Sequence, residues 1–165
     1  MGKTIKLSNE NYLDTSSIRH NSENLKNYLS VKGKTLKCGL ESNQSIPNQT
    51  TTKVNFNKYL NNNFNNDYNN YFKLNDGYIE IMSDYIKCVI VVASFQFNGF
   101  TDGYIYIAKL YAGRFATLEN YGGGATATAI IPVSKGDKIF VETYAIGEGS
   151  ISNWTDASFI EVVAI

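Results

Sequence analysis

The sequence predicts an all-β fold, a sandwich built from short antiparallel strands. From Tyr78 onward, apolar or aromatic segments alternate with turn signals at a spacing of roughly 8 to 12 residues, which is typical of sandwiches and barrels. Tyrosine occurs 12 times and phenylalanine 9 times, and both residue types favour strands. No helical period of useful length interrupts this part of the chain, so parallel βαβ units are not expected.

The expected strands follow one another between recognisable turns. Asn75-Asp76-Gly77 introduces YIEIM, and Asn98-Gly99 ends CVIVVASFQF. Asp102-Gly103 then introduces YIYIAKLY. The remaining expected strands are ATATAIIPV after Gly122-Gly123-Gly124, KIFVETYAI after Lys135-Gly136-Asp137, and the final ASFIEVVAI.

A chain of 165 residues can enclose one sizeable core, so we expect one head domain over residues 35–165 behind an N-terminal extension over residues 1–34. In the extension, Asn21 or Ser22 is suited to cap a short helix, SENLKNYLSV. A narrow apolar stripe follows from Ile18, Leu25, Leu29 and the neighbouring Tyr28. Such a stripe suits packing against copies of itself, as at the neck of a trimer, or packing on its own domain.

The charge pattern argues against nucleic acid partners, and the lack of long apolar runs argues against membrane insertion. The formal net charge is zero, from 15 basic and 15 acidic residues, and no block of like charges offers a grip on a phosphate backbone. No run of 18 apolar residues occurs, and the first 25 residues lack an apolar secretion region. We therefore expect neither membrane insertion nor a standard signal peptide.

Two cysteines are too few for a disulfide-stapled fold, and they cannot form a metal site by themselves. These are Cys38 and Cys88. Cys88 stands in the apolar run KCVIVVASF, where a buried free thiol acting as a small hydrophobe is the expectation.

Two of the expected strands are apolar on both faces. Val89, Val91, Ala93, Phe95 and Phe97 form one face of the long strand, while Cys88, Ile90 and Val92 make the other face apolar as well. In the last strand, the two faces are formed by Phe159, Val163 and Ile165, and by Ile160, Val162 and Ala164. A two-layer sandwich needs only one apolar face per strand, so the second face predicts self-association, with cover by the chain's own loops as the alternative.

The segments YFKLNDGYIEI, CVIVVASFQFNG, NYGGGATATAIIPVSKGDKIFVETYAIGEG and ASFIEVVAI, in that order, resemble the C1q/TNF-type jelly-roll head over about Cys38 to Ile165. This resemblance implies a ten-stranded antiparallel jelly roll that forms homotrimers through aromatic and aliphatic faces. The aromatic pattern of the vertebrate branch is only partly present, so the resemblance is one of fold. The residues assigned to a trimer interface on this basis are Tyr104, Tyr106, Ile160, Val162 and Ala164.

The N-terminal piece KTIKLSNENYLDTSSIRHNSENLKNYL resembles a leader of minor structural and receptor-binding proteins of phages that infect Gram-positive bacteria. It implies a phage or prophage tail or baseplate protein, attached to other tail proteins through this segment. The implied location is the virion, assembled in the cytoplasm of the bacterial host.

The residues needed for catalysis are scarce. His20 is the sole histidine, and it stands in the extension, so a Ser-His-Asp or Cys-His centre is not expected in the sandwich. No motif indicates a nucleotide, a zinc ion or another cofactor. Paired carboxylates could hydrolyse glycosides, but nothing in the spacing of the candidates selects a pair; the candidates are Asp102, Glu119, Glu142, Glu148 and Asp156.

Saccharide binding needs a flat aromatic ring to stack on sugar C–H groups and polar side chains to bond the hydroxyls. Trp154, in the polar loop GSISNWTDAS, offers the ring, although a loop tryptophan can equally fold back to cap a sandwich end. The candidate saccharide-binding residues are Trp154, Asn153, Asp156 and Tyr121.

The sequence thus favours a non-enzymatic, homotrimeric receptor-binding protein of a phage tail or baseplate that attaches to a host cell-surface saccharide. The alternative is a purely structural trimerising fibre cap, or the head of a bacterial surface or spore filament. A carbohydrate-active enzyme is the third hypothesis. No cofactor and no metal are expected.

Overall fold

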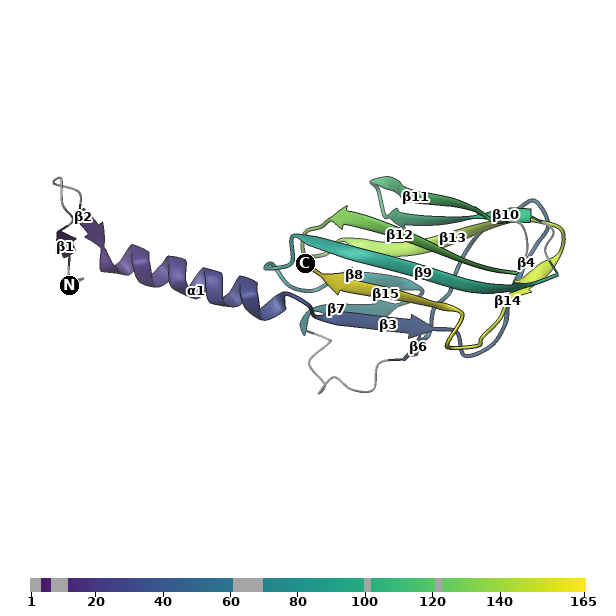
Figure 1. The fold of residues 1–165 in the computed structure, drawn as a ribbon, viewed down its shortest axis with the longest axis horizontal. Coiled ribbons are helices and arrows are strands. Elements are labelled where there is room, and N and C mark those ends of the chain that lie inside the picture. The colour runs from purple at the N-terminus through teal and green to yellow at the C-terminus, as the bar shows by residue number, and fades with distance from the viewer. Residues whose placement is uncertain (1–3, 7–11, 61–69, 100–101, 121–122) are drawn as a thin grey trace.

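The computed structural model describes residues 4–6, 12–60, 70–99, 102–120 and 123–165. The chain forms a two-layer β-sandwich from which one helix projects (Figure 1). The strand pairs within both layers are antiparallel. The all-β sandwich predicted from the sequence is therefore confirmed.

Each layer has a defined strand order. The six-stranded sheet runs β11-β10-β13-β8-β7, with β5 also paired to β13. Its strands are β5 (Thr51–Lys53), β7 (Phe72–Asn75), β8 (Tyr78–Ile81), β10 (Asp102–Lys109), β11 (Gly113–Asn120) and β13 (Lys138–Ile146). The seven-stranded sheet runs β4-β14-β9-β15-β3-β6, with β12 also paired to β9. Its strands are β3 (Thr35–Gly39), β4 (Gln44–Ile46), β6 (Lys58–Tyr59), β9 (Cys88–Asn98), β12 (Gly124–Pro132), β14 (Gly149–Ile151) and β15 (Phe159–Ala164).

The two sheets contain more described strands than the ten expected. Four of these strands, β4, β5, β6 and β14, are only two or three residues long. Segments this short carry no alternation that a sequence pattern could reveal. The other nine strands of the sandwich contain at least four residues each.

Alternation along each long strand places one face in a single core between the sheets. Along β9, Val89, Val91, Ala93 and Phe95 are buried while the residues between them are partly exposed. Phe56 stacks on Phe95 with ring centres 5.9 Å apart, so the segment after β5 closes the core at this point. Burial of the valine and phenylalanine side chains contributes about 1.5–3 kcal/mol each and holds the two layers together.

Of two turns expected from the sequence, one is present and the other lies inside a strand. Asp76 and Gly77 adopt positive φ angles of 47° and 72° and connect β7 to β8, as the Asn-Asp-Gly signal predicts. Asp102 and Gly103 instead lie within β10, paired with Ile146 and Ala145. Gly103 is needed there for a different reason, since a β-carbon at this position would collide with the Tyr144 carbonyl oxygen.

The N-terminal extension contains more regular structure than expected. A two-stranded sheet of β1 (Thr4–Lys6) and β2 (Tyr12–Asp14) precedes α1 (Thr15–Val31). The helix starts before the predicted cap at Asn21 or Ser22, directly after Asp14, a residue type that favours the N-cap position. Its first two turns are polar apart from Ile18, so the apolar pattern could not reveal them.

The helix ends where the sandwich begins. Gly33, with φ of 78°, follows the last helical turn and ends the helix before β3. The Gly33 amide donates to the Ala164 carbonyl (2.8 Å), and the Ala164 amide donates to the Lys34 carbonyl (2.9 Å). The base of α1 is thereby fastened to the end of the last strand. None of the described helices is long and apolar enough to cross a membrane.

Candidate functional site

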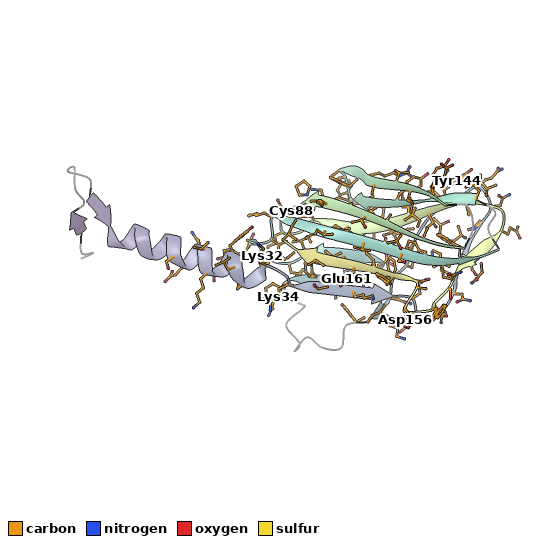
Figure 2. The ribbon with its side chains drawn as sticks, viewed as in Figure 1. Lys32, Lys34, Cys88, Tyr144, Asp156 and Glu161 are labelled. Carbon is orange, nitrogen blue, oxygen red and sulfur yellow. The ribbon has the colours of Figure 1, made fainter. Side chains whose placement is uncertain are left out.

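The first candidate surface is the outer side of the β12–β9–β15–β3 layer, called here the outward face. Strand register aligns its side chains in rows: Ile130, Ile90, Val163 and Thr35 form one row across the four strands. The next row toward the helix holds Pro132, Cys88 and Ile165, where the Ile165 amide donates to the Cys88 carbonyl (3.1 Å). Figure 2 shows Cys88 at the same end of the sandwich as Lys32 and Lys34.

The rows nearest the helix are the apolar part of the outward face, and we call Cys88, Ile90, Ile130, Val163 and Ile165 the helix-proximal patch. Ile130 is 64% exposed, and the other four side chains are partly exposed. Cys88 is thus not the fully buried thiol that its apolar sequence context suggested.

Farther from the helix the outward face becomes polar. Its rows contain Thr128, Val92, Glu161 and Lys37, then Thr126, Ser94 and Phe159. The Lys37 ammonium lies 3.8 Å from the centre of the Phe159 ring. The second apolar face predicted for β9 and β15 therefore exists, and within the described residues the chain's own loops do not bury it.

The outward face of β15 is not the one assigned to the trimer interface from the sequence. Ile160, Val162 and Ala164 are 0–1% exposed and belong to the core between the sheets. They are unavailable to another chain, so that assignment is wrong. The residues that β15 offers to a neighbour are Phe159, Glu161 and Val163, and Ile165 follows directly after the strand.

Tyr104 and Tyr106, also assigned to the interface, lie on the outer side of the other sheet. Their rings are 5.9 Å apart and nearly parallel, at 12°, and Tyr144 lies beside Tyr104 at 6.2 Å. The Arg114 guanidinium covers Tyr106 at 3.5 Å and contacts Glu142 at 3.3 Å. The nearby charge of the Glu119 carboxylate, which also accepts a hydrogen bond from Tyr104, raises the pKa of the Tyr104 hydroxyl. The ring faces are thus occupied by one another and by Arg114.

The second candidate surface is the loop between β14 and β15, which carries Trp154. This side chain is 62% exposed and does not fold back to cap the sandwich. The carbonyl of Trp154 accepts hydrogen bonds from the amides of Ala157 (3.0 Å) and Ser158 (2.8 Å), which forms a tight turn. The indole is therefore presented to solvent on an ordered backbone.

A neighbouring loop fixes the tryptophan loop in place. The Asn153 amide donates to Asn43 Oδ1 (2.8 Å), and Asn153 Nδ2 donates to the Glu41 carbonyl (3.0 Å). Asn43 and Glu41 stand 110 and 112 residues earlier in the chain, so no local sequence signal pointed to them. Asn153 thus orients the loop.

Asp156 is exposed in the same loop, whereas Tyr121 lies outside the described residues. Figure 2 shows Asp156 at the end of the sandwich opposite the helix base. The structure therefore brings Asn153, Trp154 and Asp156 together at the far end of the molecule.

A third feature, missed from the sequence, is an open groove of about 390 Å³ beside β6 and the β7–β8 turn. Its walls combine amide and carboxylate side chains with apolar and aromatic ones. The lining residues are Asn55, Phe56, Asn57, Tyr59, Leu74, Asn75, Asp76 and Gly77. Among the described residues, no group of three or more His, Cys, Asp or Glu side chains is arranged to hold a metal ion.

No protein-family model matches the chain, and no curated protein matches it in sequence. Solved structures do match the fold. Murine APRIL at pH 8.0 has a TM-score of 0.64 at 9% identity, over 81% of this chain and 100% of that chain. Eiger TNF from S. frugiperda has a TM-score of 0.55 at 13% identity, over 81% of this chain and 93% of that chain. This chain therefore has a TNF-like jelly-roll fold.

Proposed function

We propose that this protein is a non-enzymatic, homotrimeric attachment head of a phage tail or baseplate, which binds a saccharide on the host cell surface. Its outward face joins the three copies. Its tryptophan loop contacts the receptor at the end away from the helix.

The composition of the outward face supports the trimer. A solvent-facing sheet surface seldom collects several aliphatic side chains in adjacent rows, and Ile130 alone exposes 64% of its surface. Association through the helix-proximal patch removes this apolar surface from water. Each Å² of apolar surface buried in this way stabilises the trimer by roughly 25 cal/mol. Lys37 and Glu161, opposite each other on β3 and β15, supply polar groups around the patch.

The observation that carries the receptor proposal is the exposed indole of Trp154 on a fixed loop. An indole ring stacks on the C–H face of a pyranose, while amide and carboxylate groups bond its hydroxyls. Asp156 provides a carboxylate in the same loop, and Asn153, whose Nδ2 is bonded to the Glu41 carbonyl, can offer its side-chain oxygen. Three copies on one head multiply a weak single-site affinity through avidity.

The proposal is tested in two steps on the full-length protein. Light scattering measures the mass in solution, and a monomer at micromolar concentration would refute the trimer. Fluorescently labelled protein is then added to intact Gram-positive cells and to their purified wall polysaccharides. Trp154→Ala is expected to weaken binding at least about tenfold without changing the oligomeric mass.

Tyr111→Asn is the matched control for that variant. Tyr111 is 99% exposed in the β10–β11 turn and has a positive φ of 64°, a conformation that asparagine tolerates. The Tyr111→Asn variant loses an exposed aromatic ring outside the tryptophan loop, so its binding to cells and polysaccharides should be unchanged. Equal losses for both variants would contradict a site at Trp154, and loss only in Asn55→Ala would move the site to the groove beside β6.

The outward face equally supports a purely structural fibre cap that trimerises and has no ligand. A stable trimer that binds none of the cells or polysaccharides would favour this second function. Turnover of a polysaccharide by the protein would contradict both non-enzymatic proposals.

A further inference from the structure

We propose that the α1 helices of three copies form a parallel, in-register coiled-coil neck. This inference rests on the trimer of the proposed function, but it concerns a different surface. The occupant of the unpartnered side of α1 is the same helix in a second and a third copy of the chain.

The sandwich holds only one side of the helix. Val31, the last helical residue, is 3% exposed, and Asn27 Nδ2 donates to the Tyr85 hydroxyl (3.1 Å). Leu25 and Leu29 are 58% and 57% exposed. In Figure 1 the helix extends away from the sandwich, so its own domain does not cover these leucines.

The contacts and the leucines lie on opposite sides of α1. At 3.6 residues per turn, each residue advances about 100° around the axis. Leu25 and Leu29 then share a stripe with Ser22 and Ile18, while Asn27 and Val31 point about 190° away from that stripe. One side is therefore anchored to the chain's own sandwich, and the other exposes Leu25 and Leu29.

The stripe has the spacing of a coiled-coil seam. Ile18, Ser22, Leu25 and Leu29 follow one another at intervals of four, three and four residues, which are the a and d positions of a heptad repeat. Lys32 occupies the next such position and ends the apolar stripe at the base of the helix. The seam therefore spans the main length of α1.

The helix base adjoins the surface that joins the copies. The backbone bonds of Gly33 and Lys34 with Ala164 fasten α1 to the end of β15, and Ile165 of the helix-proximal patch is the next residue. Copies that associate through this patch bring their helix bases together. Because a rotation axis relates the copies, the helices leave from the same end and run parallel.

The helix also requires such cover. A helix draws most of its stability from the packing of its apolar face, and the contacts of α1 with the sandwich among the described side chains are made by Asn27 and Val31 near its end. Packing three seams together supplies the missing apolar contacts over the exposed turns.

Disulfide cross-linking tests the geometry. In a Cys88→Ser background, Leu29→Cys places a thiol in the seam, and Ser30→Cys places one about 100° away on an exposed position. Mild oxidation should join Leu29→Cys chains into covalent dimers and leave Ser30→Cys chains largely unlinked. Absence of cross-links at position 29 in a protein that is trimeric by light scattering would overturn the neck while leaving the proposed function intact.

A second variant measures the helix without cross-linking. Leu25→Ser with Leu29→Ser should leave the trimer mass unchanged but lower the helical signal at 222 nm and speed amide exchange in α1 at least about tenfold. The conservative pair Leu25→Ile with Leu29→Ile should behave like the native protein. An unchanged exchange rate in the serine variant would contradict the neck, whereas a monomeric native protein would instead refute the trimer.

Discussion

The ammonium of Lys109 lies 3.0 Å from Asp137 Oδ2, at the place where β10 meets the turn between β12 and β13. The same carboxylate oxygen accepts the Ser134 amide (2.9 Å), and Lys109 also donates to the Pro132 carbonyl (3.0 Å). Partial burial opposes the charged form of Asp137, but the Ser134 hydrogen bond and Lys109 outweigh it and lower the pKa below its ordinary value of 3.8. Asp137 thus links the turn to β10 in its ionised state.

Asp137→Asn should destabilise the protein by about 1 kcal/mol at neutral pH. Because the folded state lowers the pKa of Asp137, its ionised form adds stability above the unfolded pKa, and this is lost as the pH falls through the folded pKa. The difference between native protein and variant should therefore shrink below about pH 4, as measured by urea unfolding at several pH values.

Asp84→Asn is the control for Asp137→Asn. Asp84 pairs with Lys135 at 3.1 Å, but its side chain is 72% exposed, so its removal should cost less than about 0.5 kcal/mol. Equal effects of the two variants would show that Asp137 acts only as another surface charge.

Thr143→Val should stabilise the protein by about 1 kcal/mol. Thr143 is 1% exposed on β13, and its hydroxyl has no hydrogen-bond partner among the described residues. Valine has a similar shape and removes the cost of burying an unbonded hydroxyl. The effect is measured as a rise in the thermal unfolding midpoint.

Ser158→Ala provides the opposite case for comparison. Ser158 is also fully buried, but its hydroxyl accepts the Gln96 amide (3.0 Å). Its removal leaves that amide without a partner and should cost about 1–3 kcal/mol. Stabilisation by Ser158→Ala, or loss of stability in Thr143→Val, would contradict the hydrogen-bonding pattern described for the core.

Gly103→Ala should destabilise the protein by about 1–3 kcal/mol, because the new methyl group collides with the Tyr144 carbonyl and forces β10 and β13 apart. Gly124→Ala on β12 is the control, since a β-carbon there meets Gln96 Oε1 at an ordinary 3.4 Å. Chemical unfolding of both variants checks the difference, and equal midpoints would rule out the close approach at Gly103.

The strands were predictable because their alternation is long. Both faces of β9 are apolar in its first half, but its eleven residues are long enough to include Ser94 and Gln96, which mark the outward face in its second half. In β15 both faces are apolar, and the pattern alone left the inner face open. Glu161 lies on the same face as Phe159 and Val163. A carboxylate favours the face that meets water, but the assignment of Ile160, Val162 and Ala164 to the interface did not use this signal.

The candidate site was only partly predictable. Trp154 was found because a lone tryptophan in a polar loop is conspicuous, but its exposure depends on the packing of that loop. The bonds that hold Asn153 come from residues more than a hundred positions earlier, and only the folded chain brings them together. The helix was underestimated because its first two turns rely on polar residues with no apolar period.

The two cysteines should report assembly through different reactivities. Burial raises the pKa of the Cys38 thiol to about 12, so at pH 8 it is almost entirely protonated and sealed in the core. Cys88 is partly exposed in the helix-proximal patch. In the folded protein, a thiol reagent should therefore modify Cys88, and Cys38 only after unfolding.

Assembly into the proposed trimer should slow the reaction at Cys88, because partner copies would then cover the patch. In the native protein, labelling should be at least about tenfold slower than in Ile130→Glu, which places a charge within the patch and should give monomers. The rates are followed by mass spectrometry of intact protein at pH 8, with Thr117→Glu on β11 as a control for added charge on the other sheet. Equal Cys88 rates in native protein and Ile130→Glu would mean that the outward face stays open to solvent, and the trimer would then have to form elsewhere.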